Sequence, residues 1–177
     1  NAMNIPKARL LLTNIEEIKI TPNELIASLL MGTEYDSTAY HILKEEIKTN
    51  PKPDASTFSN CSFLGEKYDT QDNLLIILEK GITLYPKNPD LLNATGYFIA
   101  KYEIKEKYDE AEIYLEKALN LMPESEMIWD SLAWLYFKQN KYNEALKAMG
   151  IPLSRKIYNS EIAYHIGKIY LGLDNQK

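Results

Sequence analysis

The chain has 177 residues, of which 45% are hydrophobic, so it is long enough and apolar enough to bury a core. Its net charge of −5 argues against general nucleic-acid binding, because that function needs a basic surface to displace counterions from phosphates. The longest apolar run, residues 74–78, is too short to cross a bilayer, and the only cysteine, Cys61, has no partner for an intrachain disulfide. We therefore expect neither a nucleic-acid ligand nor a direct membrane span.

The amino-terminal residues carry the least regular pattern. Residues 1–3 look like the remnant of a cleaved expression tag and a start methionine, so they are set apart from the fold. Over residues 4–19, Leu11, Ile15 and Ile18 recur at the spacing of the apolar face of a helix. The sequence therefore predicts an N-terminal helix at residues 4–19.

A first helical hairpin is predicted at the start of the main domain, residues 20–177. Thr21 and Pro22 begin a helix, because threonine caps a helix and proline fits its first turn. The hairpin closes at Pro51, since the residue before a proline disfavours helix. The predicted helices of this hairpin and the next cover residues 22–31, 37–49, 55–67 and 70–84.

The later part of the chain repeats the hairpin pattern. Tyr108 and Ala111 of one copy are followed 34 residues later by Tyr142 and Ala145. A fixed period in this range is typical of stacked helical repeats. The predicted hairpins are residues 20–53, 54–88, 89–125 and 126–159, and a closing helix follows at residues 160–174.

Three sets of equivalent positions define these units. The close-packing position of the first helix holds Ala27, Ser62, Gly96, Ala133 and Gly167. The second helix holds Ala39, Leu74, Ala111 and Ala145, and the closing prolines are Pro51, Pro86 and Pro123. In each set the spacing between successive members is 37 residues at the third hairpin and 34 or 35 residues elsewhere. The longer spacing predicts an insertion at residues 103–107. Pro152 predicts an early end to the second helix of the fourth hairpin, near Met149.

The fourth hairpin carries large and small residues at fixed spacings: Trp129, Leu132, Ala133, Tyr136, Tyr142 and Ala145. Small residues let neighbouring helices approach, and large residues fill the gaps between them. This pattern resembles that of the tetratricopeptide repeat (TPR) family, bacterial type, most closely over residues 89–170. The resemblance implies an all-α fold, a right-handed α–α superhelix of about four hairpins in a single domain, closed by a C-terminal capping helix.

The sequence contains no pattern that indicates catalysis. Its two histidines, His41 and His165, lie far apart in the repeat array, and Cys61 has no histidine near it in the sequence. Structural, buried or half-buried roles are expected for all three. No phosphate-binding glycine loop and no metal-ligand spacing is present. We therefore predict a protein that is not an enzyme and that needs no cofactor and no metal.

The resemblance implies a binding groove, because the first helix of each hairpin lines the concave face in this family. One inward position holds the aromatic residues Phe63, Tyr97 and Trp134, and the next turn holds Lys67, Lys101 and Lys138. Asn93, Asp130, Tyr164 and Lys168 complete the predicted groove. The alternative interpretation is that the aromatic residues pack in the core and the lysines are ordinary solvated helix ends.

Two functional hypotheses follow from this groove. The preferred one is an interaction module that binds a partner protein or an extended peptide. The alternative is a docking or regulatory segment of a larger enzyme or cell-envelope assembly machine. We expect a monomer, with weak self-association left open at the amino-terminal end. The compartment stays open between the bacterial cytoplasm and the cell envelope or periplasm.

Overall fold

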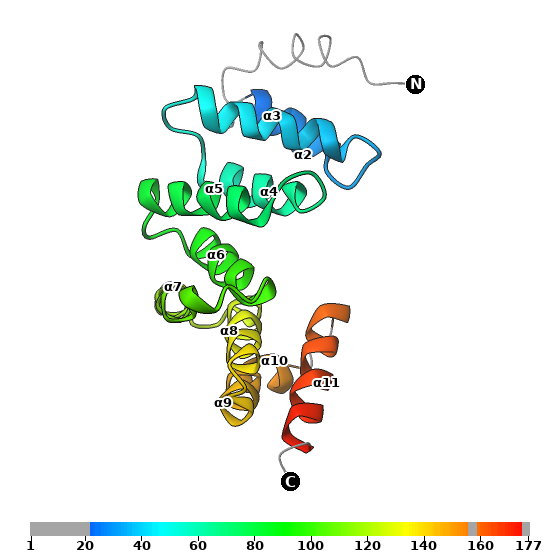
Figure 1. Cartoon of the computed structure of the whole chain (residues 1–177), viewed down its shortest axis with the longest axis vertical. Coiled ribbons are helices and arrows are strands. Elements are labelled where there is room, and N and C mark those ends of the chain that lie inside the picture. Colours follow the sequence, from blue (N-terminus) through cyan, green and yellow to red (C-terminus); the bar gives the residue numbers. More distant parts are fainter. Residues whose placement is uncertain (1–21, 156–158, 175–177) are drawn as a thin grey trace. The chain divides into compact units, whose positions relative to one another are not determined.

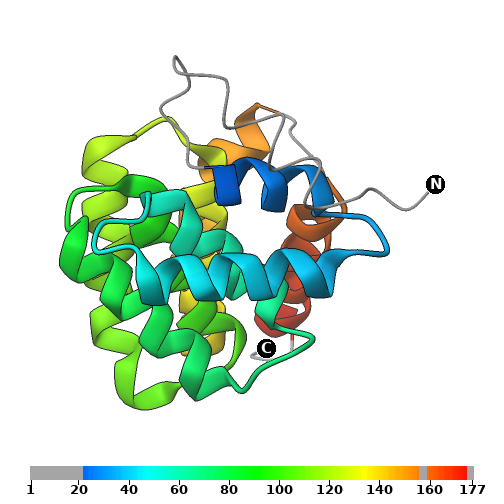
Figure 2. The ribbon, with the colours of Figure 1, turned by 90° about the horizontal axis from the view of Figure 1, so that it is seen from above.

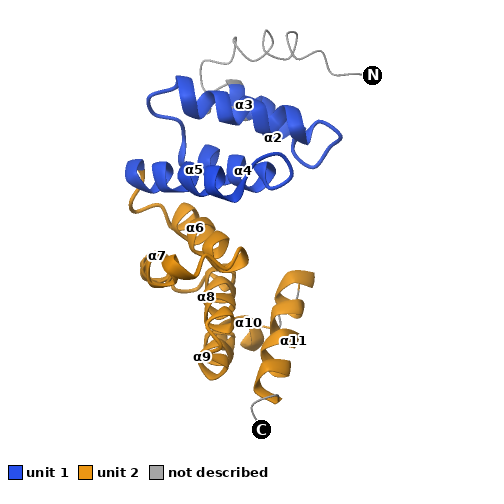
Figure 3. Ribbon diagram, in the orientation of Figure 1, with its two compact units in different colours: residues 1–84 blue, residues 85–177 orange. Residues whose placement is uncertain are grey.

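A computed structural model describes residues 22–155 and 159–174 of the chain. Every regular element within these residues is a helix (Figure 1), which confirms the predicted all-α class. The helix predicted at residues 4–19 lies outside the described residues. The chain divides into two compact units, Asn1–Leu84 and Tyr85–Lys177 (Figure 3), and each is described by itself. The grouping of all hairpins into one domain stays a prediction.

Unit 1 consists of two helical hairpins. The first pairs α2 (Pro22–Leu30) with α3 (Asp36–Thr49), which lie side by side and antiparallel (Figure 2). The second pairs α4 (Ala55–Gly65) with α5 (Gln71–Leu84), and α4 also packs against α3. These bounds agree within two residues with the predicted helices. The core of the unit is formed by apolar side chains at helical spacing: Ile26, Leu30, Tyr40, Leu43, Phe58, Cys61, Leu74 and Leu78.

The turn after α2 depends on Gly32. Its φ angle is +75°, a left-handed conformation that glycine adopts without the steric cost of a side chain. The backbone N–H of Gly32 donates a hydrogen bond of 2.7 Å to the Asp36 carboxylate, at the first residue of α3. The break between the predicted helices at residues 22–31 and 37–49 therefore lies at this glycine.

Asp69 joins the two hairpins of unit 1 through its carboxylate. It accepts hydrogen bonds from Asn73 Nδ2 at 2.7 Å, from Lys44 Nζ at 2.5 Å and from the Tyr40 hydroxyl. These hydrogen bonds, of which the one from Asn73 has the largest effect, hold the pKa of the Asp69 carboxyl well below its usual range. The Asp69 side chain is only 8% exposed. Because Tyr40 and Lys44 belong to α3, the charge of Asp69 links α3 to the loop before α5.

Unit 2 begins with a hairpin of α6 (Pro89–Lys101) and α7 (Tyr108–Leu121). The Asn88 side chain caps α6 by accepting a hydrogen bond of 2.9 Å from the Leu91 N–H. The predicted insertion between the two helices is present as the short 3₁₀-helix η1 (Lys105–Lys107). It follows Glu103, whose φ of +55° lets the chain leave α6.

The second part of unit 2 contains α8 (Glu126–Lys138), α9 (Tyr142–Ala148), α10 (Gly150–Ser154) and α11 (Ser160–Asp174). The early end predicted near Met149 is confirmed, because α9 has only seven residues and Pro152 lies in the first turn of α10. α11 packs against both α8 and α9. At one contact a Cβ atom on Gly172 would lie 2.6 Å from the Tyr142 ring, so this approach requires a glycine.

Candidate functional site

Three helices of unit 2 carry most of the predicted groove residues. α6 and α11 both pack against α8, and we call the surface that they share the α6/α8/α11 face. The predicted residues on it are Asn93, Tyr97 and Lys101 of α6, Asp130, Trp134 and Lys138 of α8, and Tyr164 and Lys168 of α11. They lie four residues apart on each helix, and such residues share one side of it.

A buried histidine–aspartate pair lies beneath this face. His165 Nδ1 is 2.9 and 3.0 Å from the two carboxylate oxygens of Asp130. A carboxylate only accepts hydrogen bonds, so Nδ1 carries a proton and donates it. Both side chains are almost fully buried, at 3% and 8% exposure. The pair therefore fixes α11 against α8.

Trp134 is covered by its neighbours. Its ring stacks on His165 with centroids 4.0 Å apart and on Phe137 at 4.8 Å, which leaves the residue 6% exposed. In contrast, Tyr164, which lies 5.9 Å from the Trp134 ring, is 54% exposed. The aromatic surface available on this side of α11 is therefore that of Tyr164, with Trp134 supporting it from below.

Tyr97 links α6 to α11. Its hydroxyl is hydrogen bonded to the Glu161 carboxylate, and its ring lies 6.2 Å from that of His165. The tyrosine is half-buried. One side chain of α6 thus contacts the same histidine that Asp130 and Trp134 hold, so the three helices share one polar and aromatic cluster.

Each of the three helices also places a lysine above an aromatic ring one turn earlier. The Nζ-to-centroid distances are 6.0 Å for Lys101 over Tyr97, 4.8 Å for Lys138 over Trp134 and 5.5 Å for Lys168 over Tyr164. A cation over the face of a ring is attracted by the ring quadrupole. Lys138 also forms an ion pair of 2.7 Å with Glu103. The positive charge of Lys138 is therefore balanced by a carboxylate as well as by the ring.

Asn93 contributes a buried hydrogen-bond acceptor without a donor. The residue is 8% exposed, and within the described part of the chain its Oδ1 atom has no hydrogen-bond partner. Leaving a buried polar atom unpaired costs about 1–3 kcal/mol. Asn93 lies one turn before Tyr97 on α6, so its position on the helix matches that of Asp130 on α8.

The two remaining predicted residues belong to unit 1. Phe63 on α4 is 65% exposed, and Lys67, just after that helix, forms an ion pair of 3.2 Å with Asp36. Both are available at the surface of unit 1. Their continuation of the row of Tyr97 and Trp134 stays a prediction.

Two residues of the cluster were not among the groove residues predicted from the sequence. His165 and Glu161 do not stand at the positions taken as inward, yet they are the contacts of α11 to Asp130 and Tyr97. The available signal was that Asp130 and His165, two isolated polar residues of apolar helices, are 35 residues apart, close to one repeat.

The structural role expected for Cys61 fits its environment, and the one expected for His41 does not. Cys61 is fully buried, and burial raises the pKa of its thiol to about 12, so the thiol is protonated near neutral pH. His41 is exposed on α3, so the expectation of a half-buried role was wrong. Its position lies on the outer side of a helix whose buried side is formed by Ala39, Tyr40 and Leu43.

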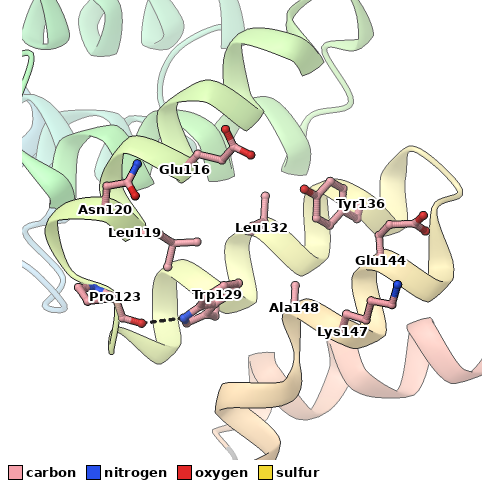
Figure 4. Close-up of a pocket in the computed structure, with 10 residues that line it drawn as sticks. All are labelled: Glu116, Leu119, Asn120, Pro123, Trp129, Leu132, Tyr136, Glu144, Lys147 and Ala148. Atoms are coloured by element: carbon pink, nitrogen blue, oxygen red, sulfur yellow. Dashed lines mark hydrogen bonds between the residues drawn. The ribbon is translucent and has the colours of Figure 1, made fainter.

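Unit 2 also has a pocket of about 790 Å³ between α7, α8 and α9 (Figure 4). The residues that line it are Glu116, Leu119, Asn120, Pro123, Trp129, Leu132, Tyr136, Glu144, Lys147 and Ala148. Three of them, Trp129, Leu132 and Tyr136, lie on the side of α8 opposite Asp130 and Trp134, because successive residues of a helix turn by about 100°. The pocket is therefore separate from the α6/α8/α11 face.

Neither a metal site nor a membrane helix is found within the described residues. No group of three or more histidine, cysteine, aspartate or glutamate side chains there is arranged to hold a metal ion. Over the same residues, no helix combines the length and the hydropathy that a membrane span requires.

Helical hairpins with small residues at their contacts define an all-α, helical-repeat fold. The comparisons agree with this class. No protein-family model matches the chain, but it is 29% identical over 142 residues, 80% of its length, to a TPR repeat-containing protein of Pseudomonas aeruginosa. The chain spans 23% of the length of that relative. The predicted resemblance to tetratricopeptide repeat proteins is confirmed.

Solved structures share the fold. A crystal structure titled MamA superimposes with a TM-score of 0.64 at 16% identity and covers 85% of each chain. A second structure, titled MamA 41-end from Desulfovibrio magneticus RS-1, has a TM-score of 0.58 at 15% identity and covers 88% of this chain and 95% of its own. A helical-repeat fold of this kind presents extended surfaces.

Proposed function

We propose that the chain is a non-catalytic interaction module whose α6/α8/α11 face binds an extended peptide segment of a partner protein. The observation that carries this proposal is Tyr164, which is 54% exposed on that face beside the half-buried Tyr97. The unpaired Oδ1 atom of Asn93, buried one turn before Tyr97, is an acceptor that a peptide N–H would reach only after the side chain turned outward. The half-buried Tyr97 and the exposed Tyr164 offer apolar area next to this acceptor.

The side chains of the face divide into contact and support roles. Tyr164 packs against an apolar side chain of the peptide, and Lys101 and Lys168 attract its acidic groups. Asp130 and Trp134 hold α11 in place through His165, so that Tyr164 is presented to the ligand. Burial of one large apolar side chain contributes about 1.5–3 kcal/mol. A few such contacts support micromolar binding once the cost of association is subtracted.

The test is affinity capture from an extract of the source organism, followed by mass spectrometry. The probing variant combines Tyr164→Ala with Lys101→Glu, and the control combines Tyr170→Ala with Lys105→Glu, which change an exposed tyrosine of α11 and an exposed lysine of η1. We expect the probing variant to lose at least about 90% of a captured partner, a change of about 1.4 kcal/mol or more in binding. Its melting temperature should stay that of the unaltered chain. Equal capture by all three proteins would contradict the proposal.

A second candidate role is that of a docking or regulatory segment within a longer protein. The observation that favours it is the Pseudomonas aeruginosa relative, in which the matching region is 23% of the whole length. The full reading frame of the gene tests this role. A neighbouring catalytic or assembly domain in the same frame would support it, and a frame that contains only the helical repeats would exclude it.

A further inference from the structure

We propose that the pocket between α7, α8 and α9 is a second binding site, which takes a short cationic segment of a partner protein. The segment has a bulky apolar side chain flanked by lysine or arginine. This site goes beyond the proposed function, since it lies on the opposite side of α8 from the α6/α8/α11 face. Its volume of about 790 Å³ is within the range of sites that hold peptide side chains and small ligands.

The floor of the pocket is apolar and consists of side chains packed in the core. Leu119, Leu132 and Ala148 form it and are buried in the fold itself. Two half-buried aromatic side chains stand at its ends (Figure 4). Trp129 Nε1 donates a hydrogen bond of 2.8 Å to the Pro123 carbonyl, and the Tyr136 hydroxyl donates one of 2.9 Å to Glu112. The rings are therefore already oriented before a ligand arrives, which lowers the entropy lost on binding.

The rim of the pocket carries unpaired negative charge. Glu116 of α7 and Glu144 of α9 stand on two sides of the opening (Figure 4), and within the described residues neither forms an ion pair. Lys147, next to Glu144, is the cation among the lining residues, so the rim is negative on balance.

The pKa of the Tyr136 phenol is raised in part by the same negative charges. Burial raises the pKa of this phenol, its hydrogen bond to Glu112 raises it further, and the carboxylates of Glu116 and Glu144 act in the same direction. The charges of α7 and α9 thus converge on the pocket.

These properties select the ligand. An apolar side chain on the floor gains from the removal of its surface from water. A lysine or arginine next to it reaches the free carboxylates, whereas an acidic segment is repelled by both glutamates. A peptide rather than a compact small molecule suits a site whose lining extends from Pro123 and Trp129 at one end to Tyr136 and Glu144 at the other (Figure 4).

The experiment uses the full chain and the peptide acetyl-Lys-Leu-Phe-Lys-amide as the probe, followed by ¹⁵N–¹H NMR. We expect saturable shifts of the amides of residues 116–120, 129–136 and 144–148. The matched peptide acetyl-Glu-Leu-Phe-Glu-amide should bind at least tenfold more weakly. Binding that ignores the charge of the peptide, or shifts confined to other residues, would overturn the proposal. So would a neutral aromatic compound that binds as tightly as the cationic peptide.

A charge series on the rim provides the second readout. Glu116→Lys with Glu144→Lys should weaken the cationic peptide at least tenfold, and Lys147→Glu should strengthen it. The two changes have opposite signs, so loss of structure cannot imitate both. If the double lysine variant melts at a lower temperature, Glu116→Gln with Glu144→Gln replaces it, with a smaller loss expected. Tyr164→Ala should leave the affinity for this peptide unchanged. The result for the pocket is then independent of whether the α6/α8/α11 face binds a partner.

Discussion

Gly96 lies at a close contact between α6 and α7. A Cβ atom at this position would lie 2.6 Å from Leu115 Cγ, and Leu115 is fully buried and has no free space to enter. Gly167 holds the same repeat position on α11, yet a Cβ atom there would meet nothing within 4 Å. The two glycines share a position in the repeat, but only the first is required by packing.

This difference predicts opposite effects of one substitution. Gly96→Ala should destabilise the chain by about 1–3 kcal/mol, because the added methyl group overpacks the hairpin. Gly167→Ala should stabilise it by about 0.5–1 kcal/mol, because alanine is the better helix former in open space. Thermal unfolding followed by circular dichroism measures both. A Gly96→Ala variant that melts like the unaltered chain would count against the helix contact.

Asp69 makes the stability of unit 1 depend on pH. Its folded pKa lies below the ordinary value of about 4, so the ionised form stabilises the fold above that value. Stability is therefore lost as the pH falls below about 4 and the carboxylate is protonated. Asp69→Asn should cost about 1.5–3 kcal/mol at pH 7, the contribution of hydrogen bonds to a charged group.

The measurement is urea unfolding followed by circular dichroism between pH 7 and pH 3. The Asp69→Asn variant should show a smaller loss of stability on acidification than the unaltered chain. Asp72→Asn, an exposed aspartate of α5, is the control and should keep the full pH dependence. The same slope in all three proteins would show that the Asp69 charge is not the cause.

At the scale of elements, one buried histidine connects α11 to α8. His165 donates to Asp130 and stacks on Trp134, and it is buried in both contacts. His165→Ala should destabilise unit 2 by about 2–4 kcal/mol, because a buried carboxylate loses its donor and a ring contact disappears. Tyr170→Ala, at an exposed position of α11, should cost less than about 1 kcal/mol.

Tryptophan fluorescence during urea unfolding measures this effect selectively, since both tryptophans, Trp129 and Trp134, belong to unit 2. We expect an earlier transition and earlier exposure of Trp134 in the His165→Ala variant. Equal midpoints for the His165 and Tyr170 variants would mean that α11 is held by its apolar contacts to α9 instead.

The helices were predictable because each feature that defines them is local. Helical spacing of apolar residues gave their extent, and Pro152 and the 37-residue repeat gave the break after α9 and the insertion at η1. The sequence left open whether Trp134 is exposed in a groove or packed in the core, because one spacing places a residue on a side of a helix without stating what covers that side. The pairing of His165 with Asp130 depends on the register between α8 and α11, which only the folded arrangement fixes.

The structure also changes the choice of test variants. From the sequence, Trp134 is an obvious contact residue, and its replacement by alanine would be the natural probe of a groove. At 6% exposure, however, that replacement would remove core packing and could lower binding through unfolding. Tyr164 separates the two effects, because it is exposed on the same face and supports no buried contact of comparable size.

At the scale of the whole molecule, α8 divides unit 2 into two surfaces of different chemistry. One side presents Tyr164 and lysines above the buried Asn93, and the other presents an apolar pocket with unpaired glutamates. An interaction module with two such surfaces can engage two segments of partner proteins at once. Substitutions on one surface should then leave binding to the other unchanged, since the two share no lining residue.

The most direct test of the central proposal is site-specific photo-cross-linking to the captured partner. p-Benzoylphenylalanine replaces either Tyr164 or Tyr170, two exposed tyrosines of the same helix α11 that point about 120° apart. The proposed function predicts a strong cross-linked product from position 164 and little from position 170. Cross-linking from position 170 alone, or in equal yield from both, would contradict binding at the α6/α8/α11 face.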